Sequence, residues 1–182
     1  MNGEQMRGYL RTATEEDMEL LFAWANETGV RKNSFSENKI TYEEHRQWYK
    51  KLLSSKDSRQ YIYMCDGVEI GQARIKVVGS EAEIGYSICF QKRCMGYGRE
   101  MIYLLREQIR NDFPAVKRLI AKVKPDNVAS QKVFLDMGYV EKYQCYELEI
   151  DKKENTPGLT DRKGNILRLT ENSNGELNFS DK

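Results

Sequence analysis

The chain has 182 residues, 40% of them apolar, which is enough to form the core of one domain of ordinary size. Its 29 basic and 28 acidic residues leave a formal net charge of +1, which excludes the strong overall field that attracts a protein to nucleic acid or to an anionic membrane. No apolar run is long enough to span a bilayer, and none follows the first charged residues as a leader would, so we expect a cytoplasmic protein.

The four cysteines, Cys65, Cys89, Cys94 and Cys145, form no Cys-x-x-Cys pair. The single histidine, His45, lies far from them in the sequence. Zinc sites need closely spaced cysteine and histidine ligands, and disulfides are rare in the reducing cytosol. We therefore expect buried, reduced thiols and no metal site.

The first residues with a clear pattern are 9–14, which read as a short strand. Thr14 and Asp17 then match a capping box ahead of apolar residues at helical spacing, which predicts a helix to about residue 26. A second capping box, Thr41 with Glu44, predicts another helix. The stretch between them, residues 29–40, is expected to be a loop with room for a substrate.

From residue 59 the apolar period changes to two. Residues 61–65 and 68–78 flank Asp66-Gly67, the usual signature of a two-residue hairpin. A second turn at Gly79-Ser80 leads into residues 81–90. We predict an antiparallel meander of three strands.

Helices and strands then alternate. An amphipathic helix follows the glycine turn near residue 96 and ends before Pro114, and residues 118–124 read as a strand. Asn127 begins another helix, with Gly138 as its expected C-cap. Residues 143–150 are predicted to close the domain as a strand.

Residues 151–182 are rich in polar residues, but they carry turn chemistry rather than the pattern of a disordered tail. Lys163-Gly164 and Asn174-Gly175 flank the alternating run at 166–170. We predict a domain over residues 1–150 and a C-terminal extension over 151–182 that forms a small β-meander. The extension can pack on the core or pair with another subunit of a homodimer.

Two motifs carry the chemistry. Arg-Cys-Met-Gly-Tyr-Gly at residues 93–98 lies where a strand gives way to a helix, and Asn127 opens a run that ends at Gly138-Tyr139. Glycine lets a ligand approach the backbone, and a helix N-terminus offers free N–H donors and the positive end of a dipole. The first motif therefore suits an anion such as a pyrophosphate.

The two motifs together resemble the GNAT superfamily of acyl-CoA-dependent N-acyltransferases, over roughly residues 7 to 150. Its cofactor motif is matched by Arg93, Gly96 and Gly98, and its second motif by Asn127, Ser130, Phe134 and Gly138-Tyr139. The resemblance implies an α/β (α+β) fold with a mixed, mostly antiparallel central sheet flanked by helices. It also implies transfer of an acetyl group from acetyl-CoA to a primary amine by direct attack in a ternary complex.

In the superfamily, pantetheine lies in a gap beside the strand before the glycine turn, and the pyrophosphate rests on amides of the turn. Asn127 would reach the pantetheine arm, although capping its own helix is a competing role. The residues that the resemblance assigns to the cofactor are Ile88, Cys89, Phe90, Arg93, Cys94, Met95, Gly96, Tyr97, Gly98, Arg99, Asn127 and Ser130. The side chains of the two arginines are expected to add charge-assisted bonds to the phosphates.

Glu83 is the candidate general base, because strand alternation puts it on the face opposite Ala82 and Ile84. A carboxylate on a merely solvated face is the competing interpretation. The general acid is open, since many relatives have a tyrosine where this chain has Phe134, which has no proton to donate. Tyr139 or Tyr143 serves instead, or solvent protonates the thiolate.

The acceptor side carries a softer resemblance, in residues 24–26, 30–35 and 40–48, to acetyltransferases of nucleotide-linked 4-amino-4,6-dideoxy sugars. It implies a pocket with aromatic rings for stacking and an arginine for a diphosphate. The residues assigned to the acceptor are Arg31, Phe35, His45 and Trp48. The competing interpretation makes His45 and Trp48 core residues of their helix.

Two other functions fit the same motifs. Acetyltransferases of protein N-termini, such as those of ribosomal proteins, open with a similar helix and Trp-Asn segment. A domain that binds acyl-CoA as a sensor without turnover is compatible with Phe134. A polyamine acceptor would call for an acidic pocket, which the sequence does not indicate.

Overall fold

The computed structural model describes residues 8–142, 168–171 and 177–180, and its main feature is a five-stranded sheet in the order β1-β2-β3-β4-β5. All neighbouring strands are antiparallel except β4 and β5, which run parallel. The strands are β1 Gly8–Thr12, β2 Ser58–Cys65, β3 Val68–Val78, β4 Glu81–Ile88 and β5 Arg118–Ala121. The expected mixed, mostly antiparallel sheet is confirmed.

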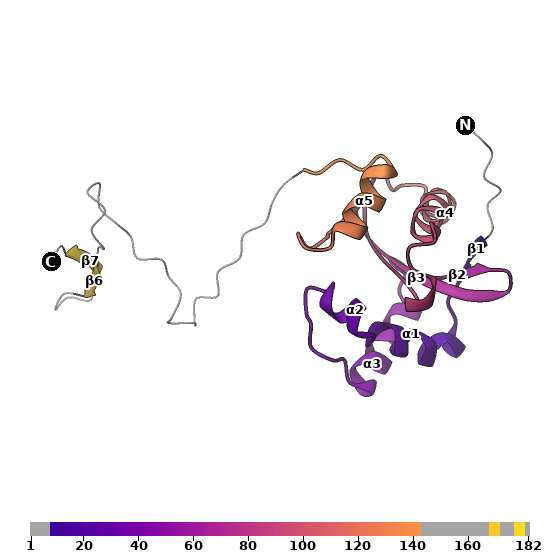
Figure 1. Cartoon of the computed structure of the whole chain (residues 1–182), viewed down its shortest axis with the longest axis horizontal. Helices are drawn as coiled ribbons and strands as arrows, with labels where there is room; N and C mark the ends of the chain where they lie inside the picture. Colours follow the sequence, from indigo (N-terminus) through magenta and orange to yellow (C-terminus); the bar gives the residue numbers. More distant parts are fainter. Residues whose placement is uncertain (1–7, 143–167, 172–176, 181–182) are drawn as a thin grey trace. The chain divides into compact units, whose positions relative to one another are not determined.

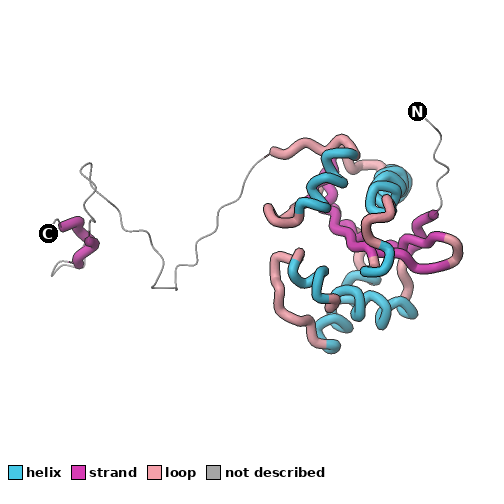
Figure 2. Tube along the Cα trace, in the orientation of Figure 1, coloured by secondary structure: helices cyan, strands magenta, loops and turns pink. Residues whose placement is uncertain are grey.

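Helices cover both faces of this sheet, with α1, α2 and α3 on one side and α4 and α5 on the other (Figure 1). Figure 2 shows the strands as a layer between the two groups of helices. The helices are η1 Glu15–Asp17, α1 Met18–Ala25, α2 Thr28–Lys32, α3 Tyr42–Leu53, η2 Phe90–Lys92, α4 Tyr97–Asp112 and α5 Val128–Asp136. No helix in the described part of the chain has both the length and the apolar character that crossing a membrane requires.

Two apolar cores hold the layers together. Because successive residues of a strand point to opposite faces, Tyr61 and Tyr63 of β2 pack with Met101 and Leu105 of α4, whereas Ile62 faces the other way. Ile62 joins a second core that includes residues of α1 and α3. Each layer of helices therefore packs on its own face of the sheet.

Most predicted elements are present, and the departures have local causes. The capping boxes at Thr14 and Thr41 form, and Gly138 follows α5 with the positive φ of 84° expected of its C-cap. The expected loop over 29–40 begins instead inside α2, because the Glu27 carboxylate accepts the N–H groups of Gly29 and Val30. The strand predicted over 118–124 ends at residue 121.

The chain divides into two compact units, Met1–Glu141 and Lys142–Lys182, whereas the sequence suggests a boundary at 150. The predicted strand 143–150 and the turn at Lys163-Gly164 lie outside the described residues. In the second unit, β6 Arg168–Glu171 pairs with β7 Leu177–Ser180 as an antiparallel two-stranded sheet.

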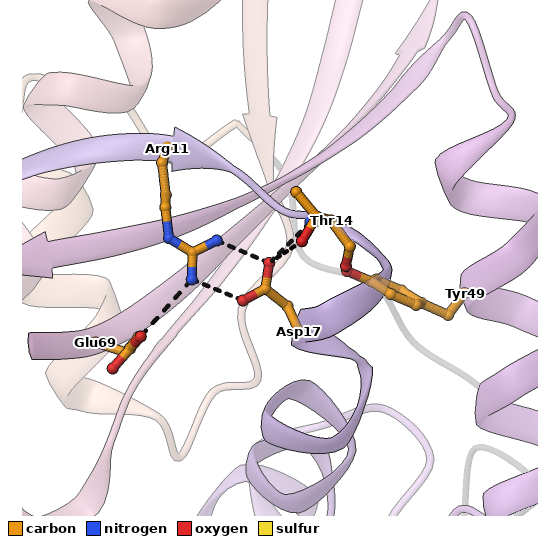
Figure 3. A network of polar contacts seen from close by, with 5 residues as sticks. All are labelled: Arg11, Thr14, Asp17, Tyr49 and Glu69. Atoms are coloured by element: carbon orange, nitrogen blue, oxygen red, sulfur yellow. Dashed lines mark hydrogen bonds and ion pairs between the residues drawn. The ribbon is translucent and has the colours of Figure 1, made fainter.

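A polar network fastens β1 to the start of the α1 layer (Figure 3). Both Arg11 terminal nitrogens donate to the Asp17 carboxylate at 2.7 Å, and the same carboxylate accepts the Thr14 N–H at 2.8 Å. Tyr49 of α3 donates its hydroxyl to the Thr14 carbonyl at 2.6 Å. Glu69 lies 3.8 Å from Arg11 on the exposed side of the network.

Asp17→Asn should destabilise the protein by about 1–2 kcal/mol, since it removes one charge from a buried, bidentate pair. The Arg11 hydrogen bonds hold the pKa of Asp17 below its ordinary value of 3.8, outweighing its burial. A depressed folded pKa gives a contribution that is present above about pH 4 and is lost as the pH falls through the folded pKa.

Urea unfolding at pH 7 and at pH 3 measures this effect. The variant should be less stable than the wild type at pH 7 and approach it at low pH. Glu69→Gln is the matched control, because this carboxylate is 41% exposed and should contribute little. Equal losses in both variants would show that Asp17 has no special role.

Candidate active site

The turn between β4 and α4 forms a backbone cradle. It contains two left-handed residues, Cys94 with a φ of 62° and Gly96 with a φ of 87°, and Gly96 is the N-cap of α4. At the start of a helix, the first N–H groups have no intrahelical carbonyl to accept them, and Gly98 lies in this first turn. The sequence predicts that the thiol of Cys94 is buried, but the residue is exposed. The cradle therefore offers donors and a helix dipole to an anion, as the sequence predicts.

Gly98 sits where this cradle meets the rest of the site. A Cβ built on Gly98 would lie 3.5 Å from the Tyr86 ring and 3.5 Å from the Val133 side chain. The first turn of α4 thus lies against both β4 and α5. A small residue keeps this approach open.

Beside the cradle, β4 and β5 separate. They pair only from Glu81–Arg118 to Ile84–Ala121, and β4 then continues alone on that side to Ile88. The Cys89 N–H donates to the Ile70 carbonyl on β3 at 2.9 Å. Because hydrogen-bonded positions alternate in an antiparallel pair, the backbone groups of Tyr86 and Ile88 face the gap. An extended chain with amides, such as pantetheine, fits this exposed edge.

At this strand end, three of the residues predicted to bind the cofactor make other contacts in the structure. The Cys89 N–H is already bound to β3, and the Ile88 carbonyl accepts the Arg93 Nε at 3.0 Å. Phe90 leaves the strand and begins η2, where its exposed ring lies 5.6 Å from the Arg93 guanidinium carbon. The backbone edge of β4 that remains open to a ligand is therefore centred two residues before Ile88, at Tyr86.

The two arginines of the turn are also not free for phosphates in this structure. Arg93 forms an ion pair with Glu27, the N-cap of α2, and Arg99 forms one with Asp136 of α5. Charge-assisted bonds from these side chains to a pyrophosphate would require both pairs to open. The geometry favours main-chain donors as the phosphate ligands.

The start of α5 borders the same gap. The Asn127 side-chain oxygen accepts the Ser130 N–H at 3.2 Å, so Asn127 caps its own helix. Asn127, Ser130 and Phe134 all line a cleft of about 780 Å³. The capping bond uses the side-chain oxygen of Asn127, which leaves its NH₂ group to reach a ligand amide.

This cleft extends from the gap to the α1–α3 layer. It is bounded by α2 and the residues that follow it, by α3, by β3 and β4, and by the segment after β5. Of the residues predicted to bind the acceptor, Arg31, Phe35 and Trp48 line it. The Phe35 ring is 72% exposed, and the Arg74 guanidinium carbon lies 5.5 Å from the Trp48 ring. An aromatic and cationic surface is thus available to a ligand.

His45 is the exception, and its predicted role in acceptor binding does not fit the structure. The residue is only 2% exposed and is not among the cleft-lining residues. Its ring packs 5.9 Å from Tyr49 and 5.3 Å from Trp48. Burial lowers its pKa more than the hydrogen bond to the Met18 backbone raises it. His45 is a neutral core residue, because it lies on the inner side of α3.

Arg31 lines the cleft, but part of its guanidinium supports the loop that follows α2. Its Nη1 donates to the carbonyls of Ser36 and Asn38, and its Nη2 to the Ser34 hydroxyl at 2.9 Å. The predicted contact with a diphosphate therefore competes with loop structure. Arg31 shapes one wall of the cleft.

Other cations give the cleft its charge. Among the described residues that line it, Arg31, Lys51, Arg74, Lys76 and Lys122 are basic, and Glu83 alone is acidic. The Glu83 carboxylate lies 2.7 Å from the Lys122 ammonium. Lys51, Arg74 and Lys76 have no salt-bridge partner in the part of the chain that the structure describes. This cluster is not evident from the sequence, since its cations come from α2, α3, β3 and the segment after β5.

Glu83 lies where strand alternation predicts. It is opposite Lys76 of β3 and faces the α1–α3 side, and its side chain is 47% exposed in the cleft. The carboxylate is thus within the site rather than on a remote solvated face. It is positioned to accept a proton from an amine held in the cleft.

Of the two tyrosines proposed as the general acid, only Tyr139 is among the described residues, and it does not line the cleft. The Tyr139 hydroxyl is buried without a hydrogen-bond partner among the described residues, and burial raises the pKa of Tyr139 to about 12. Tyr143 lies outside the described residues. Tyr86, which the sequence places only on the apolar face of its strand, does line the cleft.

Comparisons with known proteins agree with this geometry. The family model described as an acetyltransferase (GNAT) domain matches residues 7–140, whereas no curated protein sequence matches. A domain from Methanocaldococcus jannaschii is similar, with 22% identity over 77% of this chain and 92% of that one, at a TM-score of 0.68.

Two further solved structures share the fold. One is the spermidine N-acetyltransferase of Vibrio cholerae in complex with CoA and spermine, with 16% identity, a TM-score of 0.68, and coverage of 75% of this chain and 83% of that one. The other is the aminoglycoside acetyltransferase AAC(6')-Ib in complex with coenzyme A, with 20% identity, a TM-score of 0.65, and coverage of 74% and 85%.

The family match spans the sheet, the glycine cradle and the cleft. The cradle and the open edge of β4 fit the pyrophosphate and pantetheine of coenzyme A, which would supply the activated acetyl group. The chain belongs to the GNAT acetyltransferases, and it is an acetyl-CoA-dependent N-acetyltransferase.

Proposed function

We propose that this enzyme acetylates the 4-amino group of a nucleotide-linked dideoxy amino sugar, by direct attack in a ternary complex. The observation that carries the proposal is the charge of the cleft, where five cations face one carboxylate among the described lining residues. A cleft of this sign attracts a phosphate-bearing acceptor and repels a polycation. Polyamines and aminoglycosides are therefore poor acceptors in this proposal.

The positions of the cations suit a diphosphate. Arg74 and Lys76 project from β3 on the face that Glu83 shares on β4, and Lys51 comes from α3 above them. Phosphate oxygens would bind this group, while Phe35 and Trp48 offer ring faces to the base or the sugar. The amine would then lie toward Glu83, beside the gap that receives the thioester.

The cofactor roles follow from the backbone. The N–H groups of the first turn of α4, with that of Gly98 among them, would bind the pyrophosphate, with Cys94, Met95 and Gly96 setting the turn. The Asn127 NH₂ group and the edge of β4 at Tyr86 would bind the pantetheine amides. In this proposal Arg93 and Arg99 hold the cradle through Glu27 and Asp136, and do not themselves bind phosphate.

Thiol release from acetyl-CoA, measured with a panel of amines, tests the acceptor. The panel contains a nucleotide-linked 4-amino-4,6-dideoxy sugar, the same amino sugar without its nucleotide, spermidine, an aminoglycoside and a peptide with a free N-terminus. We expect the highest kcat/KM for the nucleotide sugar, and a KM that rises with ionic strength. Preference for spermidine, the aminoglycoside or the peptide would refute the proposal.

Arg74→Met and Lys76→Met should each raise the KM for the nucleotide sugar about tenfold, because a charged hydrogen bond is worth about 1.5 kcal/mol or more. The KM for acetyl-CoA should stay unchanged. Lys50→Met is the matched control, since Lys50 is an exposed cation on α3 that does not line the cleft. An equal effect of all three variants would point to overall charge rather than to a phosphate site.

A further inference from the structure

The departing thiolate of the reaction needs a proton, and Phe134 has none to give. Phe134 lines the cleft at the start of the gap between β4 and β5, so the site has no hydroxyl at this position. Tyr139 packs against Phe134 with ring centroids 5.0 Å apart, but its hydroxyl is buried away from the cleft. The described residues thus supply a different donor or none.

We infer that Tyr86 is the proton donor to the thiolate, with Ser130 as the group that resupplies its proton. This goes beyond the choice of acceptor, because every amine that the enzyme acetylates releases the same thiol.

The position of Tyr86 carries the inference. It lies on β4 two residues past Ile84, where pairing with β5 ends, and its side chain lines the cleft. Its ring contacts Phe134 edge-on, with centroids 5.6 Å apart. Its hydroxyl is 3.7 Å from the place where a Cβ on Gly98 would sit. The hydroxyl therefore lies between the cradle and α5, on the route from pyrophosphate to acetyl group.

Ser130 of α5 lines the same cleft as Tyr86, and the two side chains interact. Burial raises the pKa of Tyr86, and the Ser130 side chain lowers it by a smaller amount. The raised pKa keeps the phenol protonated at neutral pH, as a donor must be.

The step balances as follows. The amine nitrogen forms a bond to the thioester carbon, the carbon–sulfur bond breaks, and the sulfur leaves with the electron pair. The Tyr86 proton passes to the sulfur, and the phenolic oxygen regains a proton from the Ser130 hydroxyl, which is renewed from water in the cleft. The proton lost by the amine goes to Glu83 or to water. The products are an amide and a free thiol.

Tyr86→Phe tests the assignment. We expect kcat to fall about 100-fold, at the lower end of the range for general acid catalysis, because a thiol of ordinary pKa about 8.5 is a fair leaving group by itself. The KM for acetyl-CoA should change by less than about twofold, since phenylalanine keeps the ring contacts. The assay uses hydroxylamine as well as the nucleotide sugar, so rejection of the sugar leaves the test intact.

Four further variants complete the test. Tyr103→Phe removes a hydroxyl from a partly exposed tyrosine of α4 outside the cleft and should keep full activity. Ser130→Ala should lower kcat about tenfold, and Ser130→Thr, which keeps a hydroxyl, should restore most of it. A Tyr86→Phe enzyme with at least half of the wild-type kcat would overturn the assignment. So would a large loss in Tyr139→Phe alone.

Discussion

Gly98→Trp is expected to abolish binding of coenzyme A, with a loss of affinity of at least about 1000-fold, while the protein remains folded. The residue occupies the first turn of α4, where Tyr86 and Val133 already stand 3.5 Å from a built Cβ. An indole there would fill the space in which the pyrophosphate meets the N–H donors. Losing several charge-assisted bonds at about 1.5 kcal/mol each accounts for the magnitude.

Titration calorimetry with coenzyme A measures the affinity, and thermal unfolding measures the fold. Gly98→Ala is the matched control, because a Cβ at 3.5 Å is an ordinary van der Waals contact. It should bind coenzyme A nearly as well as the wild type. Tight binding by the tryptophan variant would place the pyrophosphate away from the first turn of α4.

Glu83→Gln is the second large effect that we expect, with kcat reduced about 1000-fold near neutral pH, the middle of the range for general base catalysis. The amide has the shape of the carboxylate but cannot accept the amine proton. The loss should be most severe below the pKa of the amine, where the acceptor enters mainly as its ammonium form. The KM for acetyl-CoA should be nearly unchanged.

A pH profile of kcat for wild type and variant separates this role from general electrostatics. Glu81→Gln is the control, since Glu81 points to the same face of β4, pairs with Arg118 and does not line the cleft. Parallel pH profiles for wild type and Glu83→Gln would show that another base serves. If Glu81→Gln also loses activity, the loss in Glu83→Gln reflects a change in the electrostatic field along this edge of the sheet.

The secondary structure was largely predictable because its signals are local. Thr14 and Thr41 each satisfy a capping box within four residues, and the Asp66-Gly67 turn sets the hairpin directly. The short helix α2 was not predicted, because the signal for it is not local in the sequence. Its start depends on Glu27, whose carboxylate is also fixed by Arg93, a partner far away in the sequence.

The parts of the site that the backbone forms were predictable from the sequence, whereas the parts that side chains form were less so. The glycine turn and the asparagine cap are contained in short motifs, and both appear at the expected places. Helical spacing placed His45 and Trp48 on one stripe of α3, but it could not show that only Trp48 reaches the edge of the core. The cleft cations and Tyr86 needed the sheet register to bring them together.

The ion pair between Arg93 and Glu27 has a consequence for how such an enzyme changes its acceptor. A Cβ on Gly29 would lie 2.7 Å from the Arg93 guanidinium, so a larger residue at position 29 would displace the Arg93 side chain and disturb its ion pair with Glu27. Mutations at residues 27–29 would therefore alter both substrate sites at once. New specificities can arise with less disturbance at Phe35 or Lys51, which touch the acceptor wall alone.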